Sequence, residues 1–138
     1  MTTSRNFFRN SWLLVCLVLT LVPMPVRAQT SAFALGIRTN TSTVKPGGSV
    51  GVFAWVQNNT TSKQRVTTWF TSRSACGTET MISGEGRVAL NPGQSIQVTV
   101  GYPIPPDACP GTYEVTFHVR SGSKSGTESS TSCYITVG

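Results

Sequence analysis

The chain has 138 residues and a formal net charge of +6, from 11 basic and five acidic side chains, and it contains one histidine. The basic residues are scattered singly along the sequence, whereas nucleic-acid-binding proteins gather them on one face or element. Nucleic acid is therefore not expected as a partner, and the charges are expected to form a solvated surface.

The first 28 residues have the pattern of a secretory signal peptide. Arg5 and Arg9 precede an apolar run at residues 12–22, and Val26-Arg27-Ala28 has the small-residue spacing of a cleavage site. That run is much shorter than the roughly 20 residues needed to cross a bilayer, so no stable membrane anchor is expected. Cleavage after Ala28 would leave residues 29–138 as one domain, with eight basic and five acidic residues, in an extracellular or periplasmic location.

The rest of the sequence predicts strands and no helix, because no segment has a convincing period of 3.6. Seven segments alternate apolar with polar residues or form short apolar runs between turns, and Pro-Gly pairs precede three of them. In chain order they are residues 33–37, 49–56, 64–72, 88–90, 96–100, 112–120 and 129–137. Residues 102–106 contain three prolines and are expected to form a crossover rather than a strand interior. About seven strands predict an all-β protein with a β-sandwich fold.

Residues 29–138 retain three cysteines, and export would place them in an oxidising compartment where disulfides persist. In a sandwich of this order, the end of strand 64–72 lies beside the start of strand 112–120. Cys76 follows the first strand and Cys109 precedes the second, which predicts a Cys76–Cys109 disulfide that stabilises the fold by roughly 3–4 kcal/mol. Cys133 is in phase with Ile135 and Val137, so we expect it to pack inward as a free thiol.

Several turn-and-strand motifs recur along residues 43–137. They are Val44-Lys45-Pro46-Gly47, Val56-Gln57-Asn58, Leu90-Asn91-Pro92-Gly93-Gln94, Pro105 and Gly111-Thr112-Tyr113. Together they resemble bacterial immunoglobulin-like domains, most closely the adhesion-related CARDB type and its fibronectin-type-III-like relatives. The resemblance implies an immunoglobulin-like β-sandwich. It implies a role in adhesion or assembly at the cell envelope, although the expected disulfide is not part of the family pattern. Such motifs specify a fold and not a ligand.

No catalytic residue, metal or other cofactor is expected. The three cysteines and His118 could supply four metal ligands, but the sequence lacks the closely spaced Cys pair typical of structural zinc sites. A hydrolytic triad needs a base held between a nucleophile and a carboxylate, and the five acids are dispersed. No glycine-rich phosphate loop precedes a helix.

The residues favour binding over catalysis, and alternation along the third strand indicates where a ligand would bind. Val66 and Phe70 are expected to point inward, which turns Trp69 outward on the face of the 112–120 and 129–137 strands. The candidate ligand-binding face therefore comprises Trp69, Glu114, His118, Arg120 and Tyr134. Two alternatives stay open: the reversed register, which makes Trp69 a core residue, and a Trp69 that is exposed without binding anything. Phe53 and Trp55 are expected on the other sheet, opposite the valines of their strand.

The leading hypothesis is a secreted or cell-envelope module that binds a protein or a carbohydrate without catalysis. One alternative is a protease inhibitor, because the Asn58–Thr61, Ser83–Gly86 and Ser121–Gly126 loops have a faint similarity to those of chagasin-like inhibitors. Another is an envelope or filament subunit that assembles through exposed strand edges.

Overall fold

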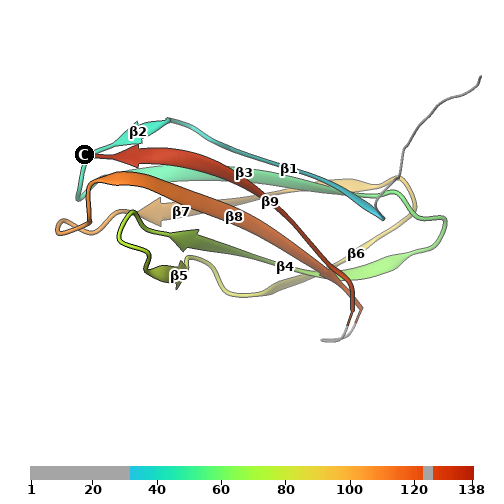
Figure 1. The fold of residues 1–138 in the computed structure, drawn as a ribbon. Helices are drawn as coiled ribbons and strands as arrows, with labels where there is room; N and C mark the ends of the chain where they lie inside the picture. The colour runs from blue at the N-terminus through green and yellow to red at the C-terminus, as the bar shows by residue number, and fades with distance from the viewer. Residues whose placement is uncertain (1–31, 123–125) are drawn as a thin grey trace, which may run out of the picture. The chain divides into compact units, whose positions relative to one another are not determined.

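A computed structural model describes residues 32–122 and 126–138 (Figure 1). The expected signal peptide, residues 1–28, lies outside the described residues. Ala32–Gly138 form one compact unit. No helix in the described ranges has the length and apolar character needed to cross a membrane.

Nine strands make up the regular structure of this unit. They are β1 (Phe33–Thr39), β2 (Thr43–Val44), β3 (Ser49–Asn58), β4 (Gln64–Arg73), β5 (Glu79–Met81), β6 (Gly86–Leu90), β7 (Ser95–Pro103), β8 (Gly111–Ser121) and β9 (Glu128–Val137). Each of the seven expected strands is present. The two additional strands, β2 and β5, have two and three residues, which is too short for a period of two to register in the sequence.

The strands form two sheets that pack against each other as a sandwich (Figure 1). One sheet has the order β1-β3-β7, and both of its pairings are antiparallel. The other has the order β2-β9-β8-β4, and both β5 and β6 pair with the remaining edge of β4. The first short strand, β2, runs parallel to β9.

One expectation about strand bounds was wrong in part, because β7 extends over the first two residues of the segment 102–106 and ends at Pro103, where the expected irregular connection begins. Tyr102 pairs with Val50 and Pro103 pairs with Ser49 of β3. Proline is tolerated here because β7 is an edge strand, and an edge residue can lack an N–H without breaking a ladder.

The core lies between the sheets and is formed by the inward residues of each alternating strand. Val50, Val52, Ala54 and Val56 of β3 are at most 1% exposed, as the alternation predicts. The opposing sheet contributes Val66, Phe70, Val115, Phe117 and Val119, each also at most 1% exposed. Burying one such side chain contributes about 1.5–3 kcal/mol, so this layer supplies the main stabilisation.

A buried asparagine connects three segments at one end of the sandwich. The side chain of Asn58 is fully buried, and its Nδ2 donates to the carbonyls of Ser62 at 3.0 Å and Leu90 at 2.9 Å. Its Oδ1 accepts from the amide and the hydroxyl of Thr60, at 2.9 and 2.7 Å. The backbone of Asn58 also accepts from Gly93 at 2.7 Å, in the turn before β7. That turn requires glycine, because Gly93 has a φ of 79°.

Replacing Asn58 should therefore cost much more than replacing its neighbour. We expect Asn58→Ala to lower the free energy of unfolding by about 2–4 kcal/mol, because it leaves buried carbonyl and amide groups without partners. Asn59→Ala, at an exposed position, is the matched control and should change stability by less than about 0.5 kcal/mol. Chemical denaturation measures both, and equal losses would contradict the role given to Asn58.

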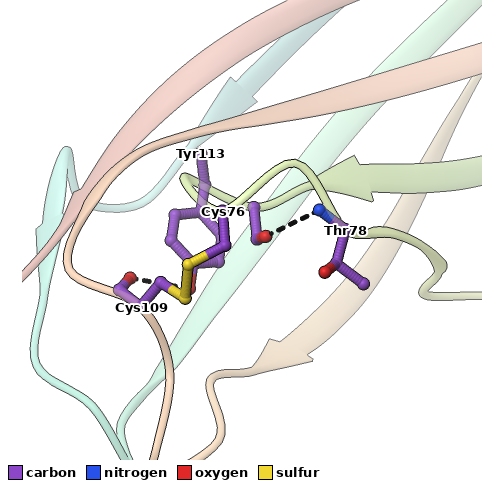
Figure 2. The surroundings of a disulfide bond; sticks show 5 residues. Cys76, Thr78, Cys109 and Tyr113 are labelled. Carbon is purple, nitrogen blue, oxygen red and sulfur yellow. Dashed lines mark hydrogen bonds between the residues drawn. A yellow bond between two sulfur atoms is a disulfide. The ribbon is translucent and has the colours of Figure 1, made fainter.

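The Cys76–Cys109 disulfide is present at the opposite end of the sandwich, which confirms the predicted pairing (Figure 2). Its Cα atoms are 6.1 Å apart, and the cysteines are separated by 33 positions in the sequence. Beside it, the hydroxyl of Tyr113 donates to the carbonyl of Cys109 at 2.8 Å. Gly111 has a φ of 131°, and a Cβ there would lie 2.8 Å from Ala75, so the approach to β8 requires glycine.

Tyr113 is 3% exposed, and this burial raises the pKa of its phenol above the ordinary value, with smaller contributions in the same direction from Tyr102 and Asp107. The folded protein therefore holds the phenolic proton more tightly than the unfolded chain does. The stability that results is complete below about pH 10, the ordinary tyrosine pKa, and is lost as the pH rises through the folded value.

We expect the free energy of unfolding to decline above about pH 10, and less steeply in Tyr113→Phe than in the unaltered protein. At neutral pH the same substitution should cost about 1 kcal/mol for the lost hydrogen bond. Urea denaturation over a pH series measures both effects. The other tyrosines are common to the two proteins, so an identical alkaline slope in both would exclude Tyr113 as the cause.

Candidate functional site

The five residues of the predicted ligand-binding face lie on the outer surface of β4, β8 and β9, which we term the polar face. Trp69 of β4 pairs directly with His118 of β8, and Arg120 lies one step along the same face of β8. Glu114 and Tyr134 pair with each other between β8 and β9, toward the other end of these strands. The structure therefore divides the predicted set into a group of three and a group of two.

Trp69 points outward, and Val66 and Phe70 point into the core, so the predicted register of β4 is correct. The expected exposure of Trp69 is wrong, because only 9% of this residue is accessible. The His118 ring stacks on the indole with a centroid distance of 4.9 Å and an interplanar angle of 4°, and the Arg120 guanidinium carbon lies 5.1 Å from the ring centroid. Cross-strand neighbours thus cover the tryptophan, which is not a free stacking platform.

Polar contacts hold this stack in place. His118 Nε2 lies 2.8 Å from Thr71 Oγ1, and His118 Nδ1 lies 3.4 Å from a carboxylate oxygen of Glu128. Arg120 approaches Glu85, from the loop before β6, at 3.6 Å. The stacked rings and these partners fix the orientation of the Arg120 side chain, which is 17% exposed.

The second group is more open to solvent. Tyr134 is 61% exposed, and its hydroxyl donates to Glu114 at 3.4 Å. Between the two groups, the hydroxyls of Thr116 and Ser132 form a hydrogen bond of 2.8 Å. An exposed aromatic ring beside hydroxyl groups is suited to contact a ligand, because it offers an apolar face and a polar tip together.

A hollow of about 510 Å³ opens on the polar face beside the stack, and the sequence analysis did not identify it. We term it the arginine hollow, after Arg65 of β4, Arg87 of β6 and Arg120 of β8, which line it together with Thr67. Thr67 pairs with Arg87 on one side and Arg120 on the other. The alternation of β4 does place Arg65 with Trp69, but the β4–β6 register that adds Arg87 has no signal in the sequence.

The outer face of the other sheet carries Phe53 and Trp55, as predicted. Trp55 is 43% exposed, and its indole lies over Gly36 of β1, where a Cβ would overlap the ring. The Arg38 guanidinium carbon lies 4.6 Å from the centroid of Phe53. The first strand therefore covers part of both aromatic side chains.

Cys133 is a free thiol that packs against the core, in phase with the buried Ile135 and Val137, as predicted. Its partial burial raises the pKa of the thiol. In the described part of the chain, no three His, Cys, Asp or Glu side chains gather closely enough to hold a metal ion.

No protein-family model and no curated protein matches the sequence. Solved structures do match, at low identity. The sporulation control protein Spo0M from Bacillus subtilis is 17% identical with a TM-score of 0.56, over 78% of this chain and 50% of its own, so the chain spans about half of Spo0M. The CARDB domain of a Pyrococcus furiosus protein, solved with two metal ions, is 14% identical with a TM-score of 0.57, over 76% of this chain and 86% of its own.

A third match comes from the complex between Zinc 2-glycoprotein and Prolactin inducible protein from human seminal plasma. It is 12% identical with a TM-score of 0.54, and the alignment covers 75% of this chain and 93% of that one. The protein thus has an immunoglobulin-like β-sandwich fold. More particularly, its fold is similar to that of the CARDB domain. The hydrogen bond from Tyr113 to a carbonyl four residues upstream agrees with this class, in which a tyrosine corner recurs at the corresponding strand.

The raised pKa of Cys133 leads to a prediction about its reactivity. Because the thiolate is the nucleophile, we expect alkylation of Cys133 at pH 8 to be slow in the folded protein and to accelerate when the protein is denatured. The labelled fraction of the Cys133 peptide, followed by mass spectrometry, measures this rate. Equal rates in the folded and the denatured protein would show that burial does not protect the thiol.

Proposed function

We propose that this chain is an exported, non-catalytic binding module whose ligand, a protein or a glycan of the cell envelope, lies on the polar face. The observation that carries the proposal is the composition of that face. One side of the larger sheet carries the exposed Tyr134, the hydroxyls of Thr116 and Ser132, and the arginine hollow. The opposite side of the same sheet forms the core.

Export is supported by the signal-peptide pattern of the first 28 residues and by the disulfide, since disulfides persist in oxidising compartments. The fold supports the binding role as a general precedent, because sandwiches of this class present rigid sheet faces and loops to partners. The rigidity comes from the buried valines and phenylalanines behind the face, which leave β4 and β8 little freedom to change register.

Tyr134 gives the most direct test, because its side chain is exposed to solvent and is not part of the core. A glycan array, and capture of envelope proteins on immobilised protein, should each be run with the unaltered chain and with Tyr134→Ser. We expect the variant to reduce binding at least tenfold, in line with the loss of an aromatic contact at an interface, with an unchanged melting temperature. Tyr134→Phe should retain most of the binding, because the ring is kept.

Trp55→Ser is the matched control, because Trp55 is an exposed aromatic residue on the other sheet. It should leave binding unchanged. Loss of binding in Trp55→Ser with retention in Tyr134→Ser would move the ligand to the other sheet. Absence of any glycan or envelope-protein ligand would reject the proposed function.

A further inference from the structure

The arginine hollow brings together three guanidinium groups that are far apart in the sequence. Residues directly opposite each other on antiparallel strands have Cβ atoms about 4.5–5.5 Å apart. Arg87 and Arg120 flank Thr67 in this way, from β6 and β8, and Arg65 lies on the same face of β4 two residues away. Thr67 is only 5% exposed and lies between Arg87 and Arg120, so it forms the floor of the hollow.

The positive charge of the hollow is not balanced by the protein. Within the described residues, Arg120 has one acidic partner, Glu85, and neither Arg65 nor Arg87 forms an ion pair. Arg65 is opposite Ala89, and Arg87 is opposite Thr67. Arg73, farther along the same face of β4, also forms no ion pair among the described residues, but the residues opposite it, Glu79 and Glu114, are both acidic.

The Arg120 side chain is also pre-organised to donate to an additional hydrogen-bond acceptor. Its guanidinium lies over Trp69 and contacts Glu85, so little side-chain freedom is left to lose on binding. Its Nε is buried and has no hydrogen-bond partner among the described residues. An arginine fork matches the geometry of two acceptor oxygens on one atom, as in a carboxylate, sulfate or phosphate group.

We propose that the arginine hollow is an oxyanion-binding subsite that recognises a sulfate, phosphate or carboxylate group carried by the ligand of the polar face. In this subsite the oxyanion balances the positive charge of Arg65, Arg87 and Arg120, and it accepts a hydrogen bond from the Thr67 hydroxyl. The subsite rests on the proposed function only in assigning the oxyanion to a larger ligand, since a free oxyanion would bind the same groups.

The test is a titration of the isotope-labelled full chain with sodium sulfate, phosphate, acetate and, as reference, chloride at matched ionic strength, followed by amide and arginine Nε–H resonances. We expect saturable shifts at Thr67, Arg87 and Arg120 with at least one oxyanion and none with chloride. The oxyanion that binds most tightly identifies the chemical group. Shifts that do not saturate, or that are the same with chloride, would overturn the proposal, because they would report only screening.

Three variants sharpen the test, and all three change exposed residues. Arg87→Gln should weaken oxyanion binding at least about tenfold, because a charge-assisted hydrogen bond is lost. Glu85→Gln should strengthen it several-fold, since it removes the carboxylate that competes for Arg120. Arg73→Gln is the control for net charge and should leave the affinity within about twofold. Equal weakening by Arg87→Gln and Arg73→Gln would overturn the proposal in favour of a general charge effect.

The outcomes for the subsite and for the proposed function can be distinguished. Oxyanion binding that depends on Arg87, in a protein for which no glycan or protein ligand is found, would sustain the subsite and reject the binding module. A ligand whose affinity depends on Tyr134, but not on salt concentration or on Arg87, would sustain the module and reject the subsite.

Discussion

The register between β4 and β8 is the constraint on which both sides of the larger sheet depend. It sets Phe70 against Phe117 in the core, with ring centroids 5.0 Å apart, and in the adjacent row it sets Trp69 against His118 on the polar face. Because side chains alternate along a strand, a slip of one residue would exchange the two rows and place polar side chains in the core. The packing of the core therefore also fixes the positions of the side chains on the polar face.

The two ends of the sandwich are secured by different interactions. At one end, Asn58 connects the β3–β4 loop, the end of β6 and the turn before β7 through buried hydrogen bonds. At the other end, the disulfide and Tyr113 connect the loops that flank β4 and β8. The arginine hollow lies toward the Asn58 end, since Arg65 is the second residue of β4, so the covalent bond and the candidate subsite are at opposite ends of the same strands.

Sequence reasoning identified the features that depend on local pattern. Alternation located the strands, the inward valines and the outward direction of Trp69, and strand order with chain direction was enough to pair Cys76 with Cys109. It did not find what depends on cross-strand register. The cover of Trp69 by His118 and Arg120, and the meeting of Arg87 with Arg65, follow from pairings between strands that no local pattern specifies. Asn58 was expected in the Asn58–Thr61 loop, but it is the last residue of β3, and its burial depends on contacts with segments distant in the sequence.

The parallel pairing of β2 with β9 has a mechanical consequence. β1 begins at the Asn58 end of the sandwich, beside the end of β3, and runs toward the disulfide end. β9 also ends at the disulfide end, beside the start of β8. The first and last described strands therefore run in the same direction along the sandwich (Figure 1). Ser42 and Val44 accept backbone hydrogen bonds from Thr136 and Gly138 across this seam. Tension applied along the chain, toward opposite ends of these strands, would load those bonds in shear. They would have to break together rather than unzip in turn, which favours resistance to pulling forces.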